Sequence, residues 1–198
     1  MSVQSHQREL ILASTSAYRR DLLARLRLPF KVFGPDIDES PLPGEPAPAV
    51  AQRLALAKAR RIAEKFPGAV AIGCDQVAES AGIAVGKPGT AEKAIRQLLG
   101  FSGREVEFHT ATAVVCLTGE FEQQALDTTV VRFRELKEDE IHRYIALDSP
   151  LDCAGAFKSE AAGPVLLQSI STQDPTAIIG LPLIALSRLL RAAGFHLP

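Results

Sequence analysis

The residues of this chain that could do chemistry gather in a few short polar stretches. The first is residues 14–20, STSAYRR, which directly follow an aliphatic run at residues 10–13. Free backbone N–H groups at a helix start, hydroxyl groups and the guanidinium groups of Arg19 and Arg20 suit phosphate oxygens. The structural alternative is a serine that caps the helix, followed by two solvent-facing arginines. The spacing alone does not separate these two readings.

A second polar stretch is residues 73–76, GCDQ, at the end of a short apolar run. Just after a predicted strand, Asp75 is placed where α/β folds put their ligands. Together with Glu39, from an acidic and proline-rich segment, it would offer hard oxygen ligands to a divalent cation. The alternative is an aspartate that forms a turn. Cys74 has no nearby histidine to make it a nucleophile, so the sequence predicts a small buried side chain there.

Two lysines add positive charge to this set. Residues 86–88, GKP, lack the full GxxxxGK[ST] pattern and so do not form a P-loop. Lys87 is either a point charge for phosphate or a solvated loop residue. Lys58 shares a helix face with Leu54 and Ile62, four residues to either side. A lysine on such a face either extends along apolar surface to water or faces a site.

The elements that must position these residues alternate between strands and helices. The hydropathy pattern predicts strands at 10–13, 30–33, 70–74 and 165–170, a small hairpin at 77–85 and a long hairpin over 104–117 and 120–134. It predicts helices at 17–27, 49–66, 90–99, 137–147 and 182–193, with Gly100 ending the third and Gly194 the last. We therefore expect a mixed α/β fold with substantial antiparallel pairing.

Composition narrows the classes of function. A chain of 198 residues, 46% hydrophobic and 23% charged, fits one globular domain without a linker. Its net charge of −1 excludes nucleic-acid binding through bulk charge. Three widely spaced cysteines favour reduced thiols over a zinc site. The first ten residues include Arg8 and Glu9, so we expect no signal peptide, no membrane helix and a cytoplasmic protein.

Taken together, the stretches resemble the Maf family of nucleoside triphosphate pyrophosphatases. The matching segments run in family order over roughly residues 9–195. They are residues 10–20 (LILASTSAYRR), 53–59 (RLALAKA), 73–76 (GCDQ), 86–88 (GKP), 151–160 (LDCAGAFKSE) and 180–183 (GLPL). Each segment is weak by itself, whereas all six in order are a specific signal.

The resemblance implies an elongated mixed sheet with flanking helices in two lobes around a cleft, like the inosine-triphosphate pyrophosphatases. It implies hydrolysis between the α- and β-phosphates of a nucleotide, a divalent metal such as magnesium or manganese, and often a homodimer. It also implies site roles, with Asp75 as proton acceptor and metal ligand. The other residues that it places in the site are Lys58 and Lys87 (catalytic), Ser14, Arg19 and Arg20 (substrate-binding) and Glu39 (metal).

Within the family the chain resembles the YceF-type subgroup, whose members hydrolyse 7-methyl-GTP. Three positions mark the subgroup, here Tyr18, Gln76 and Glu160, where the dTTP/UTP subgroup carries Arg, Thr and Gln. This chain departs from the pattern at two positions, because the subgroup usually has Trp in place of Tyr18 and often Pro in place of Ala17. Tyrosine keeps an aromatic face, although a weaker one.

Two other functions stay open at this point. One is dTTP/UTP hydrolysis, against which Tyr18 and Glu160 argue. The other is a nucleotide-sensing regulator of cell division, because the family has been linked to arrest of division. Retention of Asp75, Lys58 and Lys87 together argues against a pure sensor, since binding alone requires no base. The sequence does not separate a role of Asp75 as base from one as metal ligand.

Overall fold

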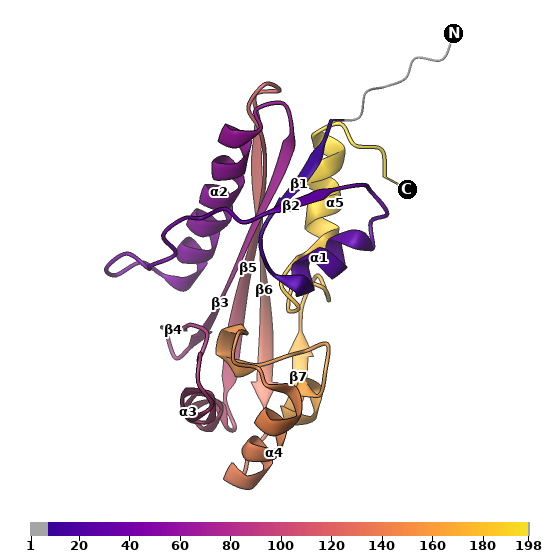
Figure 1. The fold of residues 1–198 in the computed structure, drawn as a ribbon. Coiled ribbons are helices and arrows are strands. Elements are labelled where there is room, and N and C mark those ends of the chain that lie inside the picture. Colours follow the sequence, from indigo (N-terminus) through magenta and orange to yellow (C-terminus); the bar gives the residue numbers. More distant parts are fainter. Residues whose placement is uncertain (1–7, 198) are drawn as a thin grey trace.

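A seven-stranded mixed sheet runs through the computed structural model, which describes residues 8–197 (Figure 1). The strands pair in the order β2-β1-β3-β5-β6-β7, and β4 pairs with β3 off this path. Their bounds are Leu10–Ala13 (β1), Lys31–Phe33 (β2), Val70–Ser80 (β3), Ile83–Val85 (β4), Glu105–Cys116 (β5), Phe121–Phe133 (β6) and Leu167–Ser171 (β7). The mixed α/β class expected from the sequence is therefore confirmed.

Parallel and antiparallel pairing divide the sheet at β3. Strand β1 is parallel to both β2 and β3, whereas β5 is antiparallel to β3 and β6. All four residues of β1 are buried, as expected for a short aliphatic strand with neighbours on both sides. The long β5–β6 hairpin extends the sheet well beyond the end of β1. Polar residues that follow β1 thus lie beside the middle of the longer strands.

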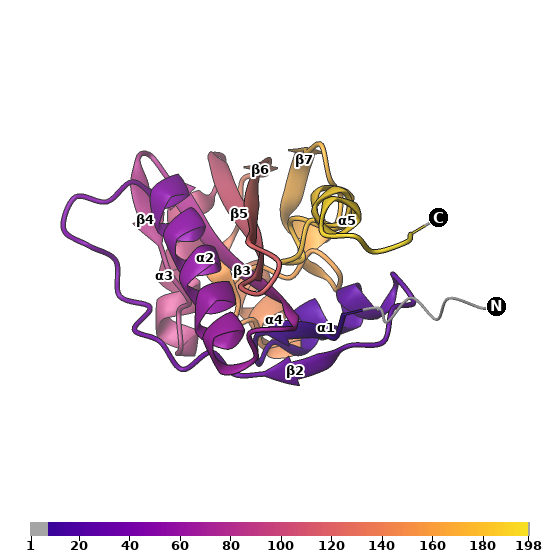
Figure 2. The same cartoon turned by 90° about the horizontal axis from the view of Figure 1, so that it is seen from above.

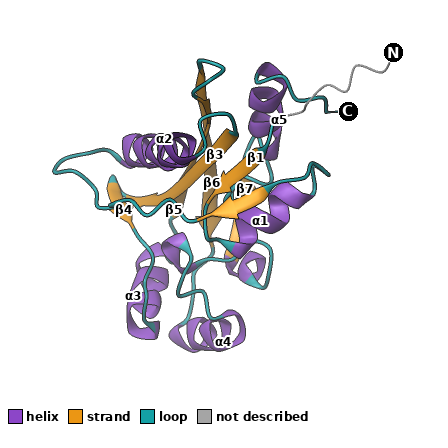
Figure 3. Ribbon diagram, turned by 45° about the horizontal axis from the view of Figure 1, so that its top comes forward, coloured by secondary structure: helices purple, strands orange, loops and turns teal. Residues whose placement is uncertain are grey.

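Helices cover both faces of the sheet (Figures 2 and 3). Helix α2 (Ala47–Lys65) packs on one face, where small residues of α2, β3 and β5 form a tight cluster. Helices α1 (Ala17–Ala24) and α5 (Leu183–Ala192) pack on the opposite face. Helices α3 (Ala91–Phe101) and α4 (Glu138–Asp148) lie at the far end of the molecule around a second core.

Three predicted boundaries are wrong, each for a physical reason. The strand expected to end before Asp75 continues to Ser80, because β5 pairs with it as far as Glu79. Gly100 does not end α3, since the following residue, Phe101, is buried in the core at the helix end. The strand expected from Val165 begins at Leu167, after a 3-10 turn at Gly163–Leu166 that contains a proline.

The remaining elements lie close to their predicted positions. The hairpin at Ala81-Gly82 and the long hairpin around Gly119 are both present. The Thr90 side chain caps α3 by accepting the backbone N–H of Lys93 at 3.3 Å. Residues 1–7, on which part of the signal-peptide expectation rests, lie outside the described residues. Within the described part of the chain, no helix combines the length and the hydropathy needed to span a bilayer.

Candidate active site

A polar pocket of about 90 Å³ opens where β1 leaves the sheet. Ala13, the last residue of β1, pairs with Gly73 of β3, so β3 continues without this neighbour from Cys74 onward. Asp75 therefore lies inside a strand, rather than after it, yet beside the carboxyl end of β1. The pocket is lined by Ala13, Ser14, Thr15, Arg19, Pro35, Glu39, Lys58, Asp75, Gln76 and Lys87.

Lys58 is held between two carboxylates at the centre of this pocket. Its Nζ donates to Oδ1 of Asp75 at 2.6 Å and to Oε2 of Glu39 at 2.7 Å. Lys58 and Asp75 are both buried, whereas the Glu39 side chain is 53% exposed. Burying an ammonium is costly unless it is paired, so the two carboxylates account for a lysine on the apolar face of α2. Each carboxylate uses one oxygen for Lys58 and keeps the other for a ligand.

A glycine sets the distance between Lys58 and Asp75. A Cβ on Gly73 would lie 2.0 Å from the carbonyl oxygen of Ala55 and 2.6 Å from the backbone nitrogen of Ala59. Helix α2 therefore approaches β3 more closely than any side chain at position 73 allows. Because Lys58 lies on α2 between these two alanines, the close approach brings its ammonium onto Asp75. Gly73 belongs to the matched segment 73–76, but nothing in the local sequence indicates this role.

The segment that carries Glu39 is tied to α2 by an arginine. Arg53 donates to both carboxylate oxygens of Glu45, at 2.6 and 2.7 Å, and to the carbonyl oxygen of Ser40 at 3.1 Å. The hydrogen bonds from Arg53 lower the pKa of the Glu45 carboxyl below its usual value. A bidentate arginine–carboxylate pair gives a defined geometry. It thus holds the acidic segment against the helix and brings Glu39 within reach of Lys58.

Arg19 enters the pocket from α1 on the opposite side of the sheet. Its Nε donates to the carbonyl oxygen of Gly180 at 3.0 Å, which fixes the guanidinium stem and leaves its terminal N–H groups for a ligand. The Ser16 side chain caps α1 by accepting the N–H of Arg19 at 3.4 Å, and Ser14 accepts the N–H of Ser16 at 3.1 Å. The serine cap expected in the structural alternative is thus present, while Ser14 and Arg19 also line the pocket, so phosphate binding there stays a prediction.

Lys87 and Arg20 are both exposed, like Glu39. Lys87 lines the pocket from the segment after β4, with its side chain free to reach a ligand. Arg20, by contrast, is not among the lining residues and pairs with its neighbour Asp21 at 3.2 Å. The structure therefore brings Arg19 and Lys87, but not Arg20, to the same pocket.

Cys74 and Gln76 hold the segment that leads into α5, and Gln76 also lines the pocket. The Cys74 thiol is fully buried, donates to the carbonyl oxygen of Gly180 at 2.9 Å, and has its pKa raised by burial to about 11. A thiol with that pKa is a poor nucleophile, as expected. The Gln76 amide donates to the carbonyl oxygens of Ala177 and Ile178 at 3.0 and 3.1 Å.

The other two predicted specificity residues, Tyr18 and Glu160, do not line the polar pocket. Both are neighbours of Lys158, Tyr18 in space and Glu160 in the sequence. The Lys158 ammonium lies over the Tyr18 ring, 5.6 Å from its centroid. Glu160 follows two residues later and is exposed, and its hydroxyl partner, Ser159, lies at 3.4 Å. Lys158 was not singled out by the sequence analysis, although it lies within the matched segment 151–160.

Next to the polar pocket is an apolar one of about 270 Å³ that shares some of its lining residues. Glu39, Asp75, Gln76 and Lys87 line both. Its apolar walls come from α2, β3, β4 and the acidic segment. The carboxylates and Lys87 therefore separate a small charged compartment from a larger apolar one.

The carboxylate oxygens in this pocket suit a metal ion that takes only one or two of its ligands from the protein. Among the described residues no group of three or more His, Cys, Asp or Glu is arranged to hold a metal ion. Glu39 and Asp75 nevertheless bring two carboxylates to one pocket. Magnesium is commonly bound through one or two carboxylates, with water and substrate phosphates as its other ligands. The residues present fit such an ion and do not fit a zinc cage.

Comparisons with known proteins agree with the resemblance seen in the sequence. A family model described as Maf-like protein matches residues 9–193. A protein from Aromatoleum aromaticum named 7-methyl-GTP pyrophosphatase is 56% identical over 191 residues, covering 96% of this chain and 98% of that protein. A Polaromonas protein of the same name is 54% identical over 190 residues, covering 96% of this chain and 87% of that protein.

Solved structures show a partial similarity. The Staphylococcus aureus Ham1 protein matches with a TM-score of 0.47 and 17% identity, covering 66% of this chain and 74% of that one. A nucleoside-triphosphatase, dITP/XTP pyrophosphatase, from Mycobacterium abscessus matches with a TM-score of 0.42 and 17% identity, covering 65% of this chain and 75% of that one. The sequence comparisons, which extend over nearly the whole chain, show that this protein belongs to the Maf family.

Proposed function

We propose that this protein is a nucleoside triphosphate pyrophosphatase that hydrolyses 7-methyl-GTP to 7-methyl-GMP and pyrophosphate. The observation that carries the proposal is the Lys58 ammonium held between Asp75 and Glu39, in a pocket that Arg19 and Lys87 also line. This arrangement offers positive charge to a triphosphate and a carboxylate to a water molecule. The name shared by relatives at 54–56% identity supports the choice of nucleotide.

In this mechanism a water molecule attacks the α-phosphorus and pyrophosphate leaves with the electrons of the broken P–O bond. Asp75 accepts the proton of the water through the oxygen that Lys58 does not hold. Lys58 keeps that carboxylate charged and oriented, while Arg19 and Lys87 neutralise charge on the phosphate oxygens. No covalent enzyme intermediate is needed, because the reaction is mainly one of positioning and charge stabilisation.

A divalent metal fits the same pocket. Glu39 would hold it through the oxygen that does not contact Lys58, and Asp75 would lie beside it with its free oxygen kept for the proton of the water. Bound there, magnesium or manganese would add positive charge against the phosphate oxygens. The hard oxygen ligands select these ions over zinc.

The base is read outside the phosphate pocket, by Tyr18 and Glu160. Methylation at N7 puts a positive charge on the guanine ring, and such a ring stacks favourably on an aromatic face. The guanine edge presents N1–H and N2–H donors, which a carboxylate such as Glu160 accepts as a pair. Gln76 contributes by fixing the segment at Ala177 and Ile178 behind the pocket.

A pyrophosphate-release assay over a nucleotide panel tests the function. We expect the highest kcat/KM for 7-methyl-GTP, a lower value for GTP, and the lowest for dTTP and UTP. A preference for the pyrimidine nucleotides would refute the assignment of the base. Binding of these nucleotides without release of pyrophosphate would instead show a nucleotide sensor.

A further inference from the structure

Lys158 connects two parts of the structure that the proposed function uses together. Its side chain reaches α1, where the ammonium lies 5.6 Å from the centroid of the Tyr18 ring. Its backbone continues directly into Ser159 and Glu160. One residue therefore touches the aromatic ring with its side chain and carries the carboxylate two positions further along the chain.

The ammonium of Lys158 is itself held in place. Its Nζ donates to the carbonyl oxygen of Asp148, the last residue of α4, at 2.7 Å. A cation at a helix C-terminus interacts favourably with the helix dipole and with the free carbonyl groups there. Lys158 thus presents a fixed charge to Tyr18 rather than a freely rotating one.

The backbone of Lys158 is equally constrained. Its N–H donates to the hydroxyl of the buried Tyr144 at 2.9 Å, and its carbonyl oxygen accepts the N–H of Gly163 at 3.0 Å. A Cβ on Gly163 would lie 2.1 Å from that oxygen, so the turn closes only with glycine there. The side chain of Asp148 accepts the N–H of Ala162 at 2.9 Å. Helix α4 therefore holds both ends of the turn that contains Glu160.

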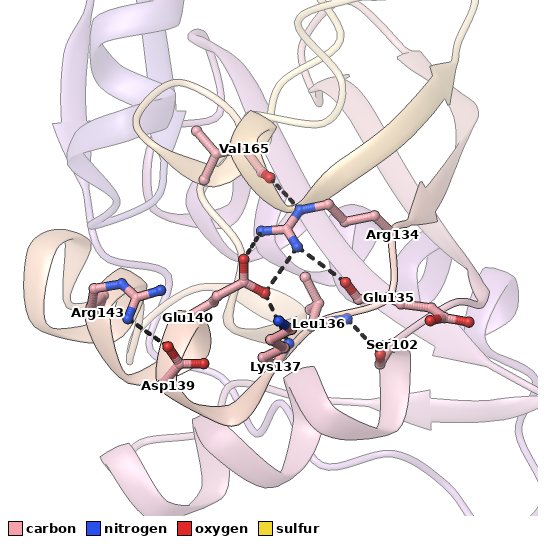
Figure 4. Close-up of polar contacts among 9 residues, drawn as sticks. All are labelled: Ser102, Arg134, Glu135, Leu136, Lys137, Asp139, Glu140, Arg143 and Val165. Atoms are coloured by element: carbon pink, nitrogen blue, oxygen red, sulfur yellow. Dashed lines mark hydrogen bonds and ion pairs between the residues drawn. The ribbon is translucent and has the colours of Figure 1, made fainter.

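Helix α4 is fixed in turn by the arginine network shown in Figure 4. Arg134 donates to both carboxylate oxygens of Glu140 in the first turn of α4, at 3.0 and 3.1 Å. The same guanidinium donates to the carbonyl oxygen of Val165 at 2.9 Å, just after the turn at 158–163. The helix and the end of the turn are thus tied to one side chain.

Burial and nearby charges raise the pKa values of two groups in this region, the Cys153 thiol and the Tyr18 phenol. Burial raises the pKa of the Cys153 thiol to about 12, with the charges of Asp152 and Glu160 adding to the effect. The nearby Lys158 ammonium lowers the pKa of the Tyr18 phenol, but burial and the charges of Cys153 and Asp152 outweigh it, so that the pKa is raised.

We infer that Lys158 is a positioning residue for base selection, which holds the Tyr18 ring and the Glu160 segment in the mutual arrangement that accepts 7-methylguanine. This inference rests on the proposed function of Tyr18 and Glu160. The ammonium holds the ring through a cation–π contact, and the anchored turn carries Glu160 two residues further along the chain.

The test compares Lys158→Met with Lys158→Arg, using 7-methyl-GTP, GTP and UTP as substrates. Methionine keeps the apolar stem and removes the charge, whereas arginine restores a cation that stacks on aromatic rings and donates to carbonyl oxygens. For Lys158→Met we expect KM for 7-methyl-GTP to rise about tenfold, with kcat within about threefold of wild type. The preference for 7-methyl-GTP over GTP should fall by about fivefold or more in Lys158→Met, and Lys158→Arg should recover most of this preference.

Controls separate this inference from the proposed function. Tyr18→Leu and Glu160→Gln report whether those residues read the base, and Arg143→Met, an exposed ion-pair residue of α4, is the matched control for loss of a cation. If Tyr18→Leu and Glu160→Gln leave the preference unchanged, the proposed base recognition is wrong. If Tyr18→Leu and Glu160→Gln lower the preference for 7-methyl-GTP and Lys158→Met does not, only the positioning role of Lys158 is wrong. An equal loss on all three substrates with a lower Tm would show a purely structural lysine and would also overturn the inference.

Discussion

Replacing Asp75 with asparagine tests the centre of the proposed mechanism. The asparagine side chain would keep the size of the group and an oxygen that can accept from Lys58 Nζ, which lies 2.6 Å from Oδ1 of Asp75. It would remove the negative charge and the basic oxygen. General-base catalysis contributes roughly 10²–10⁴-fold, so we expect kcat to fall by at least about 10²-fold.

The structure also bounds the cost in stability. Lys58 is buried, yet it keeps Glu39 as a charged partner at 2.7 Å and gains a neutral acceptor in the variant. The loss is then about that of one charge-assisted hydrogen bond, about 2 kcal/mol, rather than that of an unpaired buried ion. For a chain of this length this corresponds to a Tm lower by about 4–8 °C.

The assay is pyrophosphate release under saturating substrate, with thermal unfolding measured on the same samples. Asp139→Asn, an exposed aspartate paired with Arg143 on α4, is the matched control and should change neither quantity appreciably. A folded Asp75→Asn variant with kcat within about threefold of wild type would refute the role of Asp75 as proton acceptor. A double-mutant cycle with Lys58→Met measures how far the two residues act as one unit.

Three further predictions follow from the site and the fold. Activity should vanish when a chelator removes divalent ions and return with magnesium or manganese, whereas full activity in excess chelator would contradict the metal assignment. Gly73→Ala should destabilise the protein by about 2 kcal/mol or more, because the new Cβ would lie 2.0 Å from the carbonyl oxygen of Ala55. It should also lower kcat, because α2 and Lys58 would be pushed away from Asp75. Denaturant unfolding measures the first effect and the pyrophosphate-release assay the second. The hydrogen bonds from Arg134 lower the pKa of Glu140 to about 2. The ionised carboxylate therefore stabilises the fold at pH values above its unfolded-state pKa of 4.5, and this stabilisation is lost as the pH falls from 4.5 towards 2. Stability of Glu140→Gln should therefore depend less on pH than that of wild type in this window, and parallel curves would contradict the pairing.

Local sequence determined most of the elements. Aliphatic runs bounded by polar turns predicted the strands, and leucine and alanine spacing with Thr90 as a cap predicted the helices, since these signals act over a few residues. The error at β3 came where strand pairing determined the boundary instead. Strand β3 continues past Asp75 because β5 supplies hydrogen-bond partners along its whole length, and a polar residue inside a strand gives no local sign of that.

Local sequence also supplied the candidate chemistry, but not its arrangement. The motifs offered Lys58, Asp75 and Glu39 as candidate site residues, and the resemblance to the family implied a role for each of them. Their convergence depends on Gly73, which lets α2 approach β3, and on Arg53, which holds the acidic segment against α2. Both effects join residues that are distant in the chain, so no pattern of spacing contains them.

The difference between local sequence and tertiary packing also explains why Arg20 was wrongly placed in the pocket and why Lys158 was missed. Arg19 and Arg20 are adjacent and chemically identical, yet only Arg19 lines the pocket, because one residue along a helix turns the side chain by about 100°. Lys158 and Tyr18 lie far apart in the sequence and meet only because α4 anchors the turn at 158–163 beside α1. Residue type and local order thus determined which groups are present, whereas tertiary packing decided which of them act together.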